Sequence, residues 1–208
     1  MRHKDSIERY IDHDVLLEQR LIWVGSNILE NGEESGTNAH MAEHLIKNLN
    51  ILQLGPKGEE PITIQMNNLG GIWHHGIAMY DAIRACRAPV RIEATGYCMS
   101  MATVVLQAAD ERILHPNCRV MIHDGEDGYY GHAKNFELWA RESKILRHDM
   151  YKIYAERSGK PVGYWDKRCT LDRIMSAEEA VREGLADRVL PPVKNFPVRQ
   201  TIRAKKKR

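Results

Sequence analysis

Strand-like and helix-like segments alternate through the middle of this chain of 208 residues. The runs at 62–67 and 89–95 are short and rich in β-branched residues, whereas 39–52 carries apolar residues at helical spacing and 73–86 has the character of a second helix. Chains with this alternation connect neighbouring strands through crossover helices. The pattern therefore predicts an α/β domain.

The rest of the chain extends this prediction. A short helix or turn followed by a strand is expected within 15–26. Further strands are expected at 111–115, 119–123, 170–175 and 186–190, and further helices at 100–110, 135–159 and 176–184. Ser176 and Glu179 form a capping-box pattern at the start of the last helix. We expect a polar, loose N-terminal arm at 1–14, one domain over 15–192 and a basic, flexible C-terminal tail at 193–208.

Charge and cysteine spacing exclude several classes of protein. The formal net charge of +2 gives no strong preference for nucleic acid, since much of the excess lies in the C-terminal tail. No two of the four cysteines have the C-x-x-C spacing of a zinc or redox motif. The first residues do not form a signal peptide, and no apolar run reaches membrane-spanning length. We therefore expect a cytoplasmic protein with reduced thiols and without a metal or cofactor.

Ser100 stands alone among small and apolar residues, between an expected strand and an expected helix. A serine in this position serves as a helix N-cap, or as a nucleophile if a histidine and a carboxylate lie near it. His123 ends an apolar strand and Asp172 precedes the capped helix, although each taken singly is as readily a structural or a surface residue. Backbone N–H groups of the glycine pair at 70–71 and of Met101 would be available to an oxyanion.

Five segments, in order, resemble the proteolytic subunit of the Clp protease. GYCMSMA (96–102) is similar to that family's G-x-x-x-S-M-[GA], and HPNCRVMIH (115–123) to its LPNxRVMIH. DGYYGHAKNFELWARE (127–142) and DRIMSAEEAVREGLAD (172–187) follow two further patterns of the family, and NLGG (68–71) stands in place of SPGG. Because the motifs keep the family's order and spacing, the resemblance is far more specific than any one of them.

The resemblance implies a serine endopeptidase with the Clp protease/crotonase fold, an α/β spiral of βαβ units with a protruding handle helix. It implies that Ser100 is the nucleophile, His123 the general base and then the general acid, and Asp172 the carboxylate that orients the imidazole. By the same resemblance, the backbone N–H groups of Gly71 and Met101 form the oxyanion hole.

The resemblance also implies how substrate and subunits are bound. A strand formed by Gly128, Tyr129, Tyr130 and Gly131 would pair with an extended peptide. The helix at 135–159 would be the handle through which two heptameric rings meet, and Trp139 and Tyr151 on it are expected to pack in an interface or in the core. An AAA+ unfoldase is the partner that the family implies.

The sequence departs from the family's pattern at three places. Asn68 and Leu69 replace Ser-Pro, and a turn without proline is expected to be looser. Thr63 and Gln65 stand where the family commonly has aromatic residues that dock the ATPase. Leu171 replaces an arginine that the family uses between rings, which leaves both a single and a stacked double ring open.

Three functions are therefore compared. The first is a peptidase that works with an ATPase, and the second is an ATPase-independent peptidase of a bacterial virus that trims capsid or scaffold proteins. The third is a structural ring subunit or a crotonase-like acyl-CoA enzyme, and the intact set of Ser100, His123 and Asp172 argues against it.

Other histidines give weaker signals. His40 and His44 share one helical face, but HMAEH lacks the H-E-x-x-H order of a zinc protease, so a metal site is not expected. His74 and His75 follow NLGG, where they would lie near the cleft or face solvent at a helix start.

Overall fold

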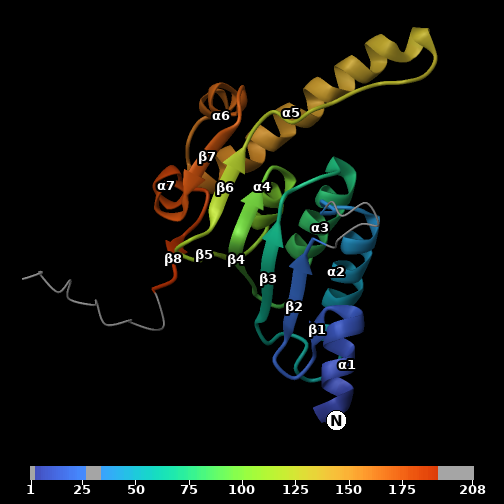
Figure 1. Ribbon diagram of the computed structural model, residues 1–208, viewed down its shortest axis with the longest axis vertical. Helices are drawn as coiled ribbons and strands as arrows, with labels where there is room; N and C mark the ends of the chain where they lie inside the picture. The colour runs from blue at the N-terminus through green and yellow to red at the C-terminus, as the bar shows by residue number, and fades with distance from the viewer. Residues whose placement is uncertain (1–2, 27–33, 192–208) are drawn as a thin grey trace, which may run out of the picture.

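The computed structural model describes residues 3–26 and 34–191 (Figure 1). Its strands are β1 (Val15–Leu16), β2 (Leu21–Gly25), β3 (Ile62–Asn68), β4 (Val90–Met99), β5 (Glu111–Leu114), β6 (Arg119–Ile122), β7 (Arg173–Ser176) and β8 (Arg188–Val189). Its helices are α1 (His3–His13), α2 (Ala39–Leu52), α3 (Trp73–Arg84), α4 (Met101–Leu106), α5 (Phe136–Ser158), α6 (Val162–Cys169) and α7 (Ala177–Glu183), with a 3-10 turn, η1 (Ala133–Asn135), before α5. The predicted alternation of strands and helices is confirmed.

One sheet runs through the described residues in the order β1-β2-β3-β4-β5-β8, with β6 beside β4 and β7 beside β6. The pairs β1–β2 and β6–β7 are antiparallel and the others parallel. The long strand β4 has two neighbours in succession: residues 91–94 pair with β5, and residues 97–99 pair with β6. This fork brings the end of β4 next to the end of β6.

Helices cover one face of the sheet. Every second side chain of β3 is buried, because successive residues of a strand point to opposite faces. In Figure 1, α2 and α3 lie side by side, and α4 packs against both α3 and α5. On the other face, Thr63 and Gln65 are only half-buried. The core therefore lies between the sheet and these helices.

Two helices differ from the sequence prediction. The prediction of a loose arm at 1–14 is wrong, because residues 3–13 form α1. The segment is mostly polar or charged, and its apolar Ile7 and Ile11 remain 45% and 72% exposed, so α1 does not bury them in the core. The helix α6 was not expected either: it begins directly after Pro161, and its fully buried Trp165 anchors it to the core.

The remaining differences are small. Segment 15–26 was expected to hold a short helix or turn and then a strand; it contains a turn at 17–20 before the strand β2, preceded by the short antiparallel strand β1. The strand expected from residue 170 begins at Arg173. The tail expected at 193–208 lies outside the described residues. The boundaries of the other predicted elements agree with the structure to within a few residues.

Candidate active site

Ser100 occupies the turn between β4 and α4 in an unusual backbone conformation. Its φ is 51° and its ψ is −124°, a left-handed region that side-chain-bearing residues rarely adopt. Such a conformation costs about 1–3 kcal/mol and persists only where the surroundings hold it. Here the Ser100 N–H donates to the Met121 carbonyl at 2.7 Å, and the Ser100 carbonyl accepts from the N–H and the hydroxyl of Thr103 at 2.9 and 2.6 Å.

The side chain of Ser100 does not act as a helix N-cap. Ser100 does occupy the N-cap position of α4, but its hydroxyl makes no capping hydrogen bond. Instead, Ser100 Oγ lies 2.7 Å from His123 Nε2. The hydroxyl is thus held away from the helix end and against an imidazole.

The register of the sheet brings His123 and Asp172 to the same place. Met99 is paired with Met121 in the parallel ladder of β4 and β6, so the residues that follow these two strands emerge together. In the antiparallel ladder of β6 and β7, Ile122 is paired with Arg173, which sets Asp172 opposite His123. His123 Nδ1 lies 3.0 Å from Asp172 Oδ1, with side chains 20% and 70% exposed.

Two backbone N–H groups border the serine. Met101 is the first residue of α4, and the N–H groups of a first helical turn have no partner within the helix. Gly70 packs so closely against Ser100 that a Cβ on it would lie 2.6 Å from Ser100 Cβ. Neither the Gly71 N–H nor the Met101 N–H donates to a protein acceptor within the described residues. Both are therefore free to bind a substrate oxygen.

Ser100 and His123 open into a cleft of about 560 Å³. Gly71, Met101 and Val104 contribute one wall, and Trp139, Leu146 and Met150 of α5 contribute another. Four residues that line the cleft carry carboxylates: Asp124, Glu126, Asp127 and Glu142. A hydroxyl, an imidazole and a carboxylate in this hydrogen-bonded order are able to generate a nucleophilic serine at the edge of such a cleft.

The expected substrate strand at 128–131 is not a strand in the structure. Residues 123–131 belong to no strand, and the cleft is lined by residues 123–127 of this segment but not by 128–131. Tyr130 is fully exposed, whereas the ring of Tyr129 stacks on that of Trp139 with centroids 5.7 Å apart. An extended segment forms strand hydrogen bonds only when another backbone lies beside it. The role of residues 128–131 in peptide binding therefore stays a prediction.

A buried tyrosine supports the turn that carries Ser100 through the side chain of Thr103. Tyr154 of α5 is fully buried, and its hydroxyl lies 2.5 Å from the Thr103 hydroxyl, which in turn donates to the Ser100 carbonyl. Burial raises the pKa of Tyr154 well above its usual value, so the phenol stays protonated. Sequence reasoning missed this contact, because only the packing of α5 on α4 brings residues 103 and 154 together.

A second support was also missed, directly after the histidine. The Asp124 N–H donates to the Cys169 carbonyl at 2.7 Å, and its carboxylate accepts from the hydroxyl of Tyr151 and lies 3.5 Å from Arg147. Tyr151, predicted to lie in an interface or the core, is 5% exposed and belongs to the core. Burial and then the Asp124 contact raise its pKa. The loop that carries His123 is therefore fastened to α5 and α6.

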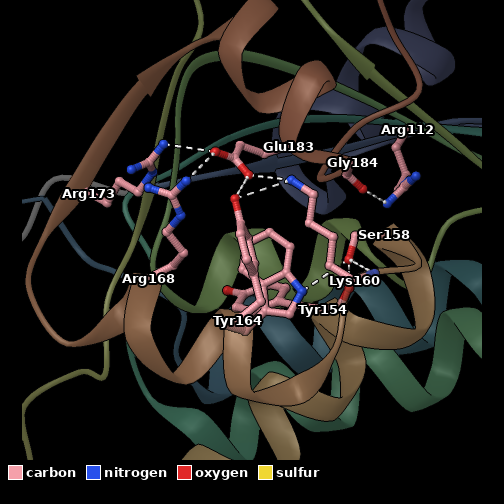
Figure 2. Close-up of polar contacts among 10 residues, drawn as sticks. Arg112, Tyr154, Ser158, Lys160, Tyr164, Arg168, Arg173, Glu183 and Gly184 are labelled. Atoms are coloured by element: carbon pink, nitrogen blue, oxygen red, sulfur yellow. Dashed lines mark hydrogen bonds and ion pairs between the residues drawn. The ribbon is translucent and has the colours of Figure 1, made fainter.

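Glu183 at the end of α7 binds side chains from α6, from β7 and from the segment between α5 and α6 (Figure 2). Its carboxylate is 13% exposed and has four partners: Lys160, Tyr164, Arg168 and Arg173. Burial by itself raises the pKa of Glu183, but hydrogen bonds from Lys160 and Tyr164 and the nearby cations outweigh it and lower the pKa. Because Arg173 follows Asp172 in the chain, this cluster also fixes the start of β7.

The other candidates contribute less to the site. His74 borders the cleft, whereas His75 does not. His44 is bound to Asp14 at 3.3 Å and packs on His40 with ring centroids 4.0 Å apart. Among residues 3–26 and 34–191, no group of three or more metal-binding side chains comes together, and no helix is long and apolar enough to cross a membrane.

The fold is α/β, and within it Ser100, His123 and Asp172 lie in one hydrogen-bonded chain of side chains. The family model described as Clp protease matches residues 5–192, and the chain belongs to the Clp protease family, a family of peptidases. The predicted family and fold class are thereby confirmed.

Two curated relatives agree with this assignment. The ATP-dependent Clp protease proteolytic subunit of Deinococcus radiodurans is 33% identical over 177 residues, which cover 84% of this chain and 82% of the relative. The ATP-dependent Clp protease proteolytic subunit 1 of Salinibacter ruber is 29% identical over 181 residues, which cover 84% of this chain and 72% of the relative.

Proposed function

We propose that this protein is a serine endopeptidase in which Ser100, His123 and Asp172 act as a catalytic triad. The observation that carries the proposal is the continuous chain of hydrogen bonds from Ser100 Oγ to His123 Nε2 and from His123 Nδ1 to Asp172. A serine hydroxyl is a poor nucleophile at neutral pH unless such a base lies within hydrogen-bond reach. The chain's membership of a peptidase family supports the proposed substrate class, which is a peptide or an unfolded protein.

In the first step, Ser100 Oγ attacks the carbonyl carbon of the scissile bond while His123 Nε2 accepts the hydroxyl proton. The carbonyl oxygen becomes an oxyanion, which the Gly71 and Met101 N–H groups bind. The intermediate then collapses: the C–N bond breaks and His123 gives its proton to the leaving amine. Water attacks the acyl-enzyme with His123 as the base, which releases the carboxylic acid and restores Ser100.

The test is labelling of the full-length protein with a fluorophosphonate probe, beside turnover of a fluorogenic peptide. Ser100→Ala should abolish labelling and lower turnover by about 10⁴- to 10⁶-fold without changing the size of the assembly. Ser143→Ala is the matched control, because Ser143 lines the same cleft without a contact to His123. Equal labelling of Ser100→Ala and wild type would refute the triad.

The assembly is part of the same proposal. Figure 1 shows the N-terminal half of α5 projecting away from the sheet, and four large apolar side chains there are exposed: Phe136, Leu138, Trp139 and Ile145. Such a patch is typical of a surface that another subunit covers. We therefore expect self-association into a heptameric ring, single or stacked, and native mass spectrometry at cytosolic salt concentration distinguishes the two.

The half-buried face of β3 bears on whether an AAA+ unfoldase is the partner. The relatives are named as ATP-dependent, but here the half-buried face of β3 is polar, and Thr63 accepts a hydrogen bond from Arg91 at 3.0 Å. Arg91 in turn lies 3.2 Å from Glu93. This charged surface favours the second candidate, an ATPase-independent peptidase such as a bacterial virus uses on capsid or scaffold proteins. Hydrolysis of a folded, tagged substrate that requires unfoldase and ATP would favour the first candidate instead.

A further inference from the structure

The turn at Asn68–Gly71 lacks the proline expected to stiffen it, yet the structure holds this turn by hydrogen bonds. Asn68 is only 1% exposed, and its Oδ1 accepts from the Gly70 N–H at 2.7 Å. An asparagine side chain that binds the N–H two residues on closes an Asx turn, which restricts the backbone much as a regular turn does. The sequence expectation of a looser turn is therefore not met.

A second element locks the Asn68 side chain. The hydroxyl of Thr37, also 1% exposed, donates to Asn68 Oδ1 at 3.3 Å, and Asn68 Nδ2 lies 2.9 Å from the sulfur of Met41. Both ends of the buried amide thus have partners. Because a buried polar group without a partner is costly, the amide has one preferred orientation.

The same threonine fixes the peptide group that follows. The Thr37 N–H donates to the Gly70 carbonyl at 2.6 Å, and the Thr37 carbonyl accepts from the Ile72 N–H at 2.9 Å, in a parallel bridge with Gly71. The Gly70 carbonyl and the Gly71 N–H belong to one planar trans peptide and point in opposite directions. Binding of the carbonyl to Thr37 therefore directs the Gly71 N–H away from Thr37 and leaves it free to donate.

This peptide lies against the candidate nucleophile. A Cβ on Gly70 would lie 2.6 Å from the Met99 carbonyl and 2.8 Å from the Met101 nitrogen, and Gly71 and Ser100 line the same cleft. An oxyanion donor contributes only when it is aimed at the position that the oxyanion will occupy. A small rotation of the Gly70–Gly71 peptide would therefore weaken the hydrogen bond that stabilises the transition state, without changing how the substrate binds in the ground state.

We propose that Asn68 is a positioning residue that, together with Thr37, aims the Gly71 N–H at the oxyanion. The proposal rests on the proposed function, because it assigns a task to an N–H that matters only if Ser100 is the nucleophile. Asn68 itself does not touch the substrate. Its effect should appear in kcat, because kcat reports interactions that are made in the transition state alone.

The experiment compares Asn68→Ala with Asn68→Ser in the full-length assembled protein. These two variants differ by one hydroxyl oxygen, which can accept from the Gly70 N–H in a weaker turn of the same kind. With a fluorogenic peptide, Asn68→Ala should lower kcat about 10- to 100-fold and change KM less than about twofold, and Asn68→Ser should recover most of the loss. The affinity of a peptide boronate, whose tetrahedral adduct occupies the oxyanion site, should fall by the same factor as kcat/KM.

Asn48→Ala is the matched control. Asn48 is a similarly buried asparagine, 4% exposed, and its amide donates to the His13 carbonyl far from Ser100 in the chain and outside the cleft. This variant should lower the melting temperature but leave kcat unchanged. If it lowers kcat as much as Asn68→Ala does, or if Asn68→Ala and Asn68→Ser have equal kcat, the positioning role is overturned.

The remaining outcomes are also decisive. If Asn68→Ala does not fold, Thr37→Val takes its place: it is isosteric and removes only the hydroxyl, so kcat should fall about threefold, and an unchanged kcat overturns the proposal. If wild type neither labels with fluorophosphonate nor cleaves peptide, the proposed function fails and this role fails with it. Active wild type with an unaffected Asn68→Ala refutes the positioning role alone.

Discussion

Glu183→Gln should destabilise the protein by about 2 kcal/mol at pH 7. In the wild type, one carboxylate oxygen accepts from Arg173 at 2.8 Å, and the other accepts from Lys160 and from Tyr164 (Figure 2). A glutamine has only one acceptor oxygen, so one side of this arrangement must face an NH₂ group. The cations around the residue also lose their only counter-charge within this cluster.

The magnitude follows from the kind of bond that is lost. Hydrogen bonds to a charged group contribute about 1 kcal/mol more than neutral ones, which gives about 3 kcal/mol for the three donors. The side chains of Lys160 and Arg173 are 28% and 34% exposed, so water screens part of their attraction to the carboxylate, and a contribution of about 2 kcal/mol remains. For a domain of this size, the melting temperature should fall by about 4–8 °C.

The pH dependence provides the sharper test. The pKa of Glu183 is lowered in the folded protein, so the carboxylate stabilises the fold above its unfolded pKa of about 4.3 and loses that effect as the pH falls through the folded pKa. The difference in unfolding free energy between wild type and Glu183→Gln should thus be constant from pH 7 to about pH 5 and narrow below about pH 4.

Urea denaturation at fixed protomer concentration measures this difference, because assembly makes stability depend on concentration. Glu156→Gln is the control: Glu156 is exposed on α5, and its loss should change nothing measurable. The reasoning would be refuted if Glu183→Gln lowered the free energy of unfolding at pH 7 no more than Glu156→Gln does. It would also be refuted if the difference in this free energy between wild type and Glu183→Gln did not decrease in acid.

Three further predictions concern the site and the thiols. Asp172→Asn should lower kcat/KM for a peptide about 10³- to 10⁴-fold with little change in melting temperature, because the Asp172 side chain is 70% exposed; an unchanged rate would remove it from the triad. Gly70→Ala should slow fluorophosphonate labelling at least tenfold, since Gly70 has a φ of 90° and no room for a Cβ, whereas Gly163→Ala, with open space around it, should be neutral; equal labelling rates would contradict this. In the native protein at pH 8, iodoacetamide should leave three thiols unmodified, because burial raises the pKa of Cys118 and Cys169 to about 12 and that of Cys98 well above its usual value; mass spectrometry checks the set Cys98, Cys118 and Cys169.

The sequence alone predicted those elements whose residue pattern is a direct result of the way the element is buried. Apolar residues at helical spacing located α2, because burial of one helix face imposes that spacing directly, and a run rich in β-branched residues located β3. Order and spacing of motifs singled out Ser100, His123 and Asp172 as candidates and assigned the family. The polar α1 escaped prediction, because Ile7, Tyr10 and Ile11 are the only large apolar side chains of a segment that is otherwise polar or charged.

Tertiary structure alone decided how those candidates meet. Residues 100, 123 and 172 are distant in the chain, and only the fork of β4 and the register of β6 with β7 bring their side chains within hydrogen-bond reach. The same holds for Asn68: its sequence position suggested a looser turn, whereas the buried contact with Thr37 fastens it. Sequence patterns report which residues one segment buries, but hydrogen bonds between segments depend on the register and packing of the whole sheet, which no single segment encodes.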